Sequence, residues 1–535
     1  MEKILRTDNA YQAIDKINSN FAEAGAGGDN ARIEGEITGN GNDFVYYHFS
    51  AKPGDYMHVE FPNGSWATTH SRDSYNRLVF GWVDNNNTHH SIAEISRESW
   101  VVPEYGYDLY VSDGVTNMKE AYLAFRAASS VIVPFIITWL SKDSMKPYFS
   151  DEMADTVAKV RARQGEATLT MTWCSDVHYR DIQAQYRPFA PFAAPGMGLT
   201  MKELARRVRL DNIVCTGDVI DGLWSAERGK LDARDMARTF SGIGVPLIYA
   251  IGNHDDNRYF ANEDGDRNFT AQEIHAEFIQ QVDERTTVGG PMQGCNYYRD
   301  IDRLKLRIIV LMSINFNKAY QYSAETQQFL TETFASMPEG YKALIFAHTP
   351  LTSTQSYPNT SFPGGGTIET IIKNNLDKFI CFFFGHTHFD NFYMTPFPEV
   401  NIGAAKVYNT ESGTAGDTAP EGAYFCERAA GDYREQLWDT IVVDQTNALL
   451  SLIRFGAGPD RYIHYTPVEV AAGGTTTLTP SCITADSWET RASETDISIA
   501  AGTVTIAAGA TSGTRLTAIA KDADGNMEIW CIKIA

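Results

Sequence analysis

Six short apolar runs between residues 167 and 384 constrain the fold more than any other feature. They lie at 167–174, 211–215, 246–251, 307–313, 342–347 and 379–384, and they alternate with helix-like segments such as 200–209, 271–283 and 324–335. Buried strands that alternate with helices are typical of α/β layering. The sequence therefore predicts an α/β domain at the centre of the chain.

A polar motif follows five of these runs directly. The motifs are CSDVHYR, CTGDVIDG, IGNHDD, FAHTP and FGHTHFD, and they hold five of the twelve histidines. In α/β sheets, ligands bind at the carboxyl ends of strands. Because residues at i and i+2 of an extended segment point to the same side, Asp176 can share a small volume with His178, and His386 with His388. Carboxylate, amide and imidazole donors without cysteine suit divalent first-row metal ions.

Each motif taken alone has a simpler explanation. A GD dipeptide after a strand is usually a turn, an HxH pair is usually a coincidence, and a single histidine is usually structural. All five motifs in one order, each after an apolar strand, favour a shared site. Glycines at 217, 252 and 385 would let the backbone turn sharply and come close to that site.

As a set, the motifs resemble the signature of the calcineurin-like metallophosphoesterase superfamily over roughly residues 167–465. The matching residues are Asp176-x-His178, Gly217-Asp218, Gly252-Asn253-His254-Asp255, His348 and Gly385-His386-x-His388. The resemblance implies a central four-layer α/β/β/α fold with two divalent metal ions, Mn, Fe, Zn or Ni, at the strand ends. It is specific to the superfamily and says little about the substrate.

The resemblance also implies a role for each residue. One metal would be bound by Asp176, His178, Asp218 and His388, and the other by Asp218, Asn253, His348 and His386. The metals would generate a hydroxide that attacks a phosphomonoester or phosphodiester, with manganese and zinc as typical ions. His254 would protonate the leaving group, and Asp221 would orient His254.

One departure from the family speaks against the protein serine/threonine phosphatases. Those enzymes have Arg-Gly after the residue that matches Asp221, whereas Gly222 and Leu223 follow it here. Arg180, Arg258 or another cation would then have to bind the phosphate. Two alternatives to a phosphoesterase stay open: a catalytically silent binding or structural protein on this fold, and an exonuclease of the same superfamily.

The regions around the centre are expected to be β-rich. Short alternating runs predict a β-sandwich at 29–140, which could bind a glycan through exposed aromatic residues, although aromatics at strand spacing are usually core. Residues 141–166 are expected to contain a linking helix over 151–163. Residues 466–535, rich in Thr, Ala, Gly and Ile, predict a small C-terminal β-sandwich.

Residues 1–28 combine a short amphipathic helix with a glycine-rich joint. Ala10, Ile14, Ile17 and Phe21 form an apolar stripe that needs a partner. The segment resembles short stretches near the start of tail and fibre proteins of bacterial viruses. That implies a homo-oligomer or docking onto a larger particle such as a virion, with a phosphate-containing cell-surface glycan as target. Packing onto the chain's own β-sandwich is the alternative.

Charge and composition argue against nucleic-acid binding and a membrane span. The net charge of −22 removes the usual electrostatic driver of nucleic-acid binding. No run approaches the roughly 20 apolar residues of a membrane span, and the N-terminus lacks the apolar core of a signal peptide. A cytoplasmic or virion-associated location is therefore expected. The seven cysteines show no metal-binding spacing and are interpreted as buried apolar residues in a reducing compartment.

Overall fold

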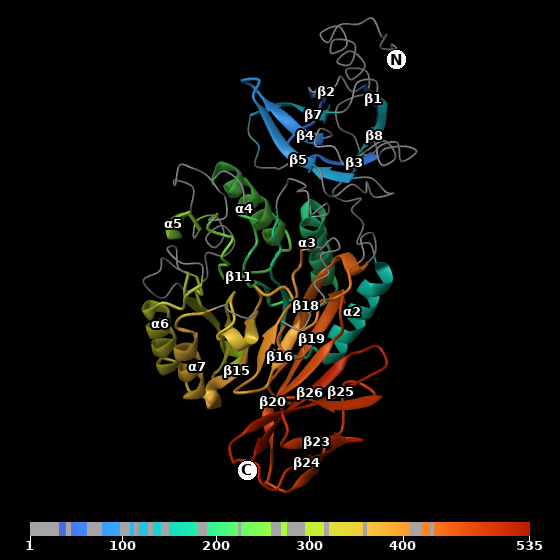
Figure 1. Ribbon diagram of the computed structural model, residues 1–535. Helices are drawn as coiled ribbons and strands as arrows, with labels where there is room; N and C mark the ends of the chain where they lie inside the picture. The colour runs from blue at the N-terminus through green and yellow to red at the C-terminus, as the bar shows by residue number, and fades with distance from the viewer. Residues whose placement is uncertain are drawn as a thin grey trace, which may run out of the picture.

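The computed structural model arranges the chain as an N-terminal pair of small sheets, a central α/β region and a C-terminal β region (Figure 1). It describes residues 32–38, 44–60, 77–96, 107–111, 115, 117–126, 132–140, 149–179, 190–222, 226–257, 269–274, 276, 295–314, 320–356, 361–406, 419–428 and 433–535. The helix expected near the N-terminus lies outside these residues. No helix among those described is long and apolar enough to cross a membrane.

Two antiparallel four-stranded sheets form the N-terminal part. Their orders are β1 (Arg32–Thr38), β8 (Ile132–Leu140), β3 (Tyr56–Glu60), β6 (Tyr107–Tyr110), and β2 (Val45–Phe49), β7 (Met118–Arg126), β4 (Arg77–Asp84), β5 (His89–Ser96). Phe49, Phe125 and Phe135 belong to their shared core. Phe80 and Trp82 are also core, whereas Tyr46 is 43% exposed. Among these described aromatic residues, those in the core are not available for glycan contact, whereas Tyr46 presents part of its surface.

A nine-stranded mixed sheet runs through the central and C-terminal parts. Its order is β11 (Leu247–Tyr249), β10 (Asn212–Cys215), β9 (Thr168–Cys174), β18 (Leu437–Asp444), β19 (Leu449–Gly456), β20 (Arg461–Val470), β26 (Met527–Ile534), β25 (Arg515–Lys521), β22 (Ser487–Thr490). Strands β9, β10 and β11 are parallel to one another. Their carboxyl ends therefore meet at one edge of the sheet.

The second central sheet has six strands. Its order is β12 (Tyr297–Ile301), β13 (Leu306–Val310), β14 (Lys342–Phe346), β15 (Phe379–Phe384), β17 (Glu399–Asn401), β16 (Asn391–Tyr393). Strands β13, β14, β15 and β17 are parallel. In this sheet, the parallel strands β14 and β15 lead into the predicted motifs FAHTP and FGHTHFD.

Strand β15 shows why the two sheets pack together. It is apolar at every position because both of its faces are buried. Phe383 points toward the first sheet, where its ring lies 5.1 Å from that of Trp173. Phe382 and Phe384, on the opposite face, join the core formed with helices α6 (Ala324–Ala335) and α7 (Gly365–Lys373). The tight packing of both faces holds the carboxyl end of β15 in place.

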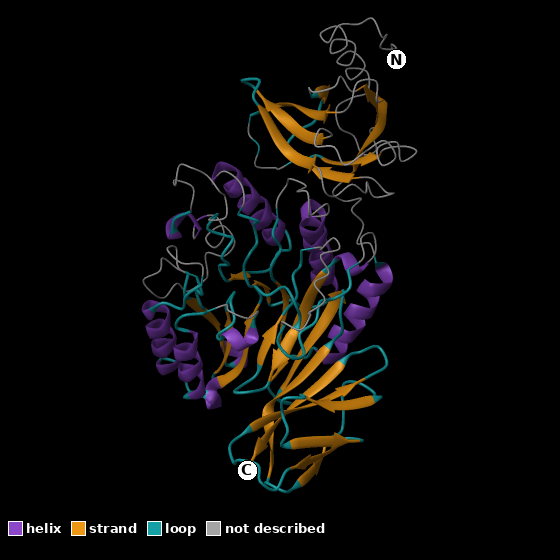
Figure 2. Ribbon diagram, viewed as in Figure 1, coloured by secondary structure: helices purple, strands orange, loops and turns teal. Residues whose placement is uncertain are grey.

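Helices also cover the nine-stranded sheet (Figure 2). They are α2 (Ser150–Arg163), α3 (Ala190–Arg207) and α4 (Ala226–Ser241). The short helix α5 (Ala271–Ile274) follows β11 in the chain. Met153, Met201 and Phe240 bring α2, α3 and α4 into the main core. Helix α2 matches the helix expected at 151–163. These contacts are compatible with the α/β/β/α order that the family resemblance implies.

The C-terminal region shares its main sheet with the centre. The sequence predicts a small β-sandwich at 466–535, and one of the sheets there is shared with the centre, because β20 pairs in parallel with β26 and so continues the nine-stranded sheet. A small sheet of β21 (Thr475–Thr477), β24 (Thr503–Ile506) and β23 (Ile497–Ala500) covers it. Val504 and Trp530 lie in the core between them. The region therefore has its own core and its own three-stranded sheet, and its larger sheet is continuous with the central one.

A buried ionic network joins the two central sheets. Arg454 lies 2.6 Å from Asp439 and 3.0 Å from Asp390, and Arg461 lies 2.6 Å from Asp439. All four side chains are at most 3% exposed. Burial would raise the pKa of Asp390, but the charges of Arg454 and Arg461 hold it well below its usual range. The Asp390 carboxylate therefore stays ionised in the interior.

We predict that Arg461→Met destabilises the protein by about 3–5 kcal/mol, because it leaves two buried carboxylates, Asp390 and Asp439, to share the single charge of Arg454. Chemical denaturation followed by tryptophan fluorescence measures the loss. Lys521→Met, which removes a surface cation paired with Glu489 at 2.8 Å, is the control and should change stability little. Equal effects of the two substitutions would contradict the prediction.

Candidate metal centre

Strand ends from both central sheets converge on one point. Strand β9 leads to Asp176 and His178, β10 to Asp218, and β11 to Asn253 and His254. In the second sheet, β14 leads to His348, and β15 leads to His386 and His388. The structure brings together all seven side chains that the resemblance predicts as metal ligands, in overlapping groups of buried or nearly buried donors.

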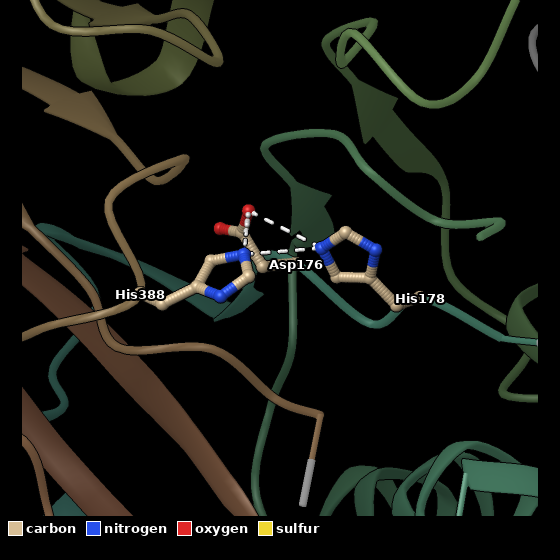
Figure 3. A group of neighbouring side chains, drawn as sticks. All are labelled: Asp176, His178 and His388. Atoms are coloured by element: carbon tan, nitrogen blue, oxygen red, sulfur yellow. Dashed lines mark hydrogen bonds and ion pairs between the residues drawn. The ribbon is translucent and has the colours of Figure 1, made fainter. Parts of the chain in front are cut away.

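The first group consists of Asp176, His178 and His388 (Figure 3). Nε2 of His388 lies 3.2 Å from Oδ1 of Asp176 and 3.0 Å from Nε2 of His178. The two imidazoles meet almost at right angles, at 76°. Three donor atoms thus surround one small volume.

The second group consists of Asp218, His348 and His386. Nε2 of His348 lies 3.2 Å from Oδ2 of Asp218 and 3.0 Å from Oδ1 of Asn253. Nδ1 of His348 lies 2.7 Å from the Thr216 carbonyl, which orients the ring so that Nε2 faces the other donors. Asn253 joins this group as an oxygen donor.

Asp218 lies between the two groups. Its Oδ2 is 3.2 Å from Nε2 of His348 and 3.7 Å from Nε2 of His178. Its Oδ1 accepts a 2.8 Å hydrogen bond from the backbone N–H of His254, which fixes the plane of the carboxylate. One carboxylate therefore faces both sets of donors.

The donors reach this arrangement through unusual backbone. The φ angles are positive at five donor-bearing residues, which are Asp176 (53°), His178 (46°), Asp218 (50°), His386 (69°) and His388 (64°). This left-handed region is rarely occupied by residues other than glycine, and such residues cluster at functional sites. It turns each side chain into the shared volume directly after the strand ends.

Two glycines are needed here for different reasons. Gly217 has φ of 96°, so it makes the sharp turn that we expected. Gly385 has no positive φ, but a Cβ at this position would lie 1.9 Å from Oγ of Ser175 and 2.4 Å from Oδ2 of Asp176. It allows close approach of two loops rather than a turn. The turns after β15 are made by His386 and His388 themselves.

Charges in the group shift the pKa values in opposite directions. Burial opposes a charge on His348, but the carboxylates of Asp218 and Asp176 outweigh it and raise the pKa of the imidazole to about 9. Burial and the charge of His348 lower the pKa of His386 to about 3. Burial also lowers the pKa of His388. Near pH 7 the metal-free group therefore holds a proton on His348, while His386 and His388 are neutral.

The donor set fits divalent metal ions. Two imidazole nitrogens only 3.0 Å apart and a carboxylate oxygen beside them need a cation or a proton among them. Within the described residues, no hydrogen bond of good geometry reaches the buried Oδ1 of Asp176. Nitrogen and oxygen donors of this kind suit zinc, manganese, iron or nickel. Asp218 belongs to two of the three overlapping groups of donors that could each hold a metal ion, one with His178 and His254 and one with His348 and His386.

His254 lies beside the donors and contacts Asp221 in an unexpected way. We expected the Asp221 side chain to orient His254, but Nδ1 of His254 lies 2.7 Å from the backbone carbonyl of Asp221. The Asp221 carboxylate instead lies 3.3 Å from Nδ1 of His178. Asp221 thus orients His254 through its main chain and contacts a predicted ligand through its side chain.

Sequence reasoning assigned no role to Asp255, which organises the loop of Asp218. Its buried carboxylate accepts hydrogen bonds from the backbone N–H groups of Asp218 (3.0 Å), Val219 (2.8 Å), Ile220 (3.2 Å) and Gly252 (2.8 Å). The Tyr249 hydroxyl donates a further one at 2.5 Å. The motif GNHD contained this residue, but no local pattern identifies the backbone groups that it serves.

Comparison with known proteins agrees with this geometry. Residues 169–390 match the family model described as calcineurin-like phosphoesterase. A search among curated proteins found no match.

Solved structures with a similar fold have low sequence identity. A dimetal phosphatase from Danio rerio is 13% identical and has a TM-score of 0.41, with 56% of this chain and 99% of that chain covered. GAP50, the anchor in the inner membrane complex of Plasmodium, is 10% identical with a TM-score of 0.32, covering 53% of this chain and 84% of that one. The family match therefore identifies residues 169–390 as a calcineurin-like phosphoesterase domain.

Proposed function

We propose that this domain hydrolyses a phosphomonoester or phosphodiester with two bound divalent metal ions. The observation that carries the proposal is the position of Asp218, whose Oδ2 faces His348 at 3.2 Å and His178 at 3.7 Å. A carboxylate between two donor groups is the feature that a dinuclear site needs. Asp176, His178 and His388 would complete one metal site, and Asn253, His348 and His386 the other.

The two ions would supply the electrostatic part of the chemistry. When bound, they lower the pKa of a water toward neutrality and stabilise charge on the phosphate oxygens. The surrounding residues hold the donors in place. His178 is oriented by the Asp221 carboxylate at 3.3 Å and His348 by the Thr216 carbonyl at 2.7 Å. Such outer contacts fix which ring nitrogen is free to bind a metal.

His254 is the proposed general acid. Its Nδ1 faces the Asp221 carbonyl at 2.7 Å and can donate a hydrogen bond there, which leaves Nε2 with the transferable proton. Its side chain is 20% exposed, whereas His348 is fully buried, so an incoming leaving group can reach it. Nε2 lies 3.9 Å from Oδ2 of Asp218, so the ring is next to the carboxylate proposed to face both metal positions.

Two alternatives make different demands on the same site. A catalytically silent binding or structural protein would need neither a proton at His254 nor a second metal. An exonuclease would need a surface that attracts nucleic acid, which the net charge of −22 does not favour. An assay with chromogenic phosphomonoesters, phosphodiesters and nucleotides distinguishes the phosphoesterase from the silent protein and from the exonuclease. In this assay, Mn²⁺, Ni²⁺ or Zn²⁺ is added to metal-free protein.

The remaining expectations concern regions outside the site. Assembly through residues 1–28, attachment to a virion, a glycan target and a cytoplasmic or virion-associated location stay predictions. They concern either residues outside those that the structure describes or the biological setting of the chain.

We predict that Asp218→Asn loses most of the activity and at least one metal, because a neutral amide is a poor bridge between two dications. Elemental analysis after metal saturation, together with the ester assay, measures both effects. Asp377→Asn, at an exposed position before β15, is the matched control and should keep two metals. A wild-type chain that holds at most one metal at saturation would refute the dinuclear site.

We predict that His254→Ala slows esters with poor leaving groups by about 10²–10⁴-fold and p-nitrophenyl phosphate much less, because only the former need a proton at the transition state. A series of aryl and alkyl phosphates measures this dependence. A uniform loss across the series would exclude His254 as the acid.

We predict that metal binding releases a proton from His348. Its pKa of about 9 in the metal-free group means that it is protonated at pH 7, and a metal can bind only the neutral ring. Metal affinity should therefore rise by up to about tenfold per pH unit below pH 9, where one proton is displaced. Calorimetry at pH 7 in buffers of different protonation enthalpy counts the proton. A pH-independent affinity would contradict the assignment.

A further inference from the structure

The turn between His386 and His388 contains Thr387, which has no metal to bind in the proposed site. Both histidines have left-handed backbone, with φ of 69° and 64°. Residues other than glycine keep this conformation only where the surrounding structure enforces it. Strand β15 already ends at Phe384, so the strand does not extend through the turn. Contacts from other segments must therefore hold it.

Backbone hydrogen bonds fix one side of the turn. The N–H of His386 donates to Oδ2 of Asp176 at 2.8 Å. This bond leaves Oδ1 of the same carboxylate 3.2 Å from Nε2 of His388. The N–H of Thr387 donates to the Gly385 carbonyl at 2.8 Å, within the turn itself. None of these bonds uses the side chain of Thr387.

The side chain of Thr387 is held by Asn401, the last residue of β17. Nδ2 of Asn401 donates a hydrogen bond to Oγ1 of Thr387, and both residues are at most 3% exposed. Among the described residues, Oδ1 of Asn401 has no hydrogen-bond partner, so Thr387 is the one partner of this amide. Asn401 pairs with Phe384 in the parallel ladder. A neighbouring strand thus reaches the middle of the turn through a single side-chain contact.

The backbone around Asn401 is fixed on both sides. Nη1 of Arg461 donates to the Asn401 carbonyl at 3.1 Å, and the next N–H, that of Ile402, donates to the Phe384 carbonyl at 3.2 Å. Arg461 is itself paired with Asp439 at 2.6 Å in the buried ionic network. A closely packed interior of this kind transmits position from one segment to the next. The amide of Asn401 is therefore a fixed point to which the turn is attached.

On the basis of the two-metal site proposed above, we propose that the hydrogen bond between Asn401 and Thr387 positions the turn so that its two histidines bind different metals. The histidines belong to different donor groups. A change in the turn between them therefore moves one ligand of each group. Outer contacts that orient metal ligands typically contribute about 10–100-fold to metal affinity. Loss of this contact weakens both sites, although neither positioning residue binds a metal.

The test compares Thr387→Val with Thr387→Ser in the full-length chain. Valine keeps the branched shape of threonine without the hydroxyl, whereas serine keeps the hydroxyl. Calorimetric titration of metal-free protein with Mn²⁺ should show about 10–100-fold weaker binding of both ions to Thr387→Val. Thr387→Ser should bind Mn²⁺ like the wild type. His388→Ala, which removes a ligand of one group, should weaken mainly one ion.

Asn401→Ala removes the same contact from the other side. It should weaken Mn²⁺ binding by a similar factor. The double variant of Thr387→Val and Asn401→Ala should bind no worse than the weaker single variant, because both substitutions remove one shared hydrogen bond. Melting temperatures of the metal-free variants, measured in parallel, separate lost affinity from lost folding.

Thr440→Val is the matched control. Thr440 is buried in β18, and its hydroxyl has no hydrogen-bond partner within the described part of the chain. The substitution makes the same change of side chain away from the turn. It should leave the affinity for both Mn²⁺ ions unchanged.

Any of four results would overturn the inference. They are unchanged Mn²⁺ affinity in Thr387→Val, weaker binding of one ion alone, a Thr387→Ser variant as impaired as Thr387→Val, and additive losses in the double variant. A wild-type chain that binds two ions but cleaves no phosphate ester would instead refute the proposed hydrolysis, and the metal titration would still decide the role of the turn.

The two arginines considered from sequence for phosphate binding, Arg180 and Arg258, lie outside the described residues. The titration does not involve them, because its probe is the metal ion alone.

Discussion

The buried carboxylate of Asp255 supports the metal centre more than any other single group. It accepts backbone hydrogen bonds from Asp218, Val219, Ile220 and Gly252, so it connects the loop after β10 to the loop after β11. Asp218 can face both donor groups only while this loop keeps its shape. Burial and the nearby Asp218 carboxylate raise the pKa of Asp255 to about 6, while the surrounding N–H groups favour its charged form. The position of Asp218 between the two donor groups therefore depends on a second buried carboxylate, that of Asp255.

The two central sheets contribute to the centre in a complementary way. The nine-stranded sheet carries the carboxylates, the amide and two histidines, and the six-stranded sheet carries the other three histidines. The network of Arg454, Arg461, Asp390 and Asp439 fixes one sheet to the other, and Asp390 also accepts a hydrogen bond from the backbone N–H of Gly403, just after β17. The relative position of the donors therefore depends on the packing and the ionic contacts that hold the two sheets together.

Much of the site was predictable because its signals are local. Apolar runs mark the strands, and the motifs that end them name the seven donors and His254 in sequence order. Long-range contacts were not predictable. Nothing near Asp221 indicates that its carbonyl, rather than its carboxylate, faces His254. The parallel pairing of β20 with β26 joins residues 64 to 66 positions apart, such as Arg461 with Met527. Such features come from packing between distant segments, which residue types alone do not specify.

The left-handed backbone at the five donor-bearing residues has a thermodynamic consequence. Each such residue costs about 1 kcal/mol relative to ordinary backbone, so the five together amount to a substantial part of the roughly 5–15 kcal/mol that stabilises a typical domain. The folded chain offsets this conformational cost by packing elsewhere. Under the proposed function, donors that the fold holds close together would need little reorganisation to bind metal ions. Backbone geometry that is fixed during folding would therefore contribute to the metal affinity of the folded protein.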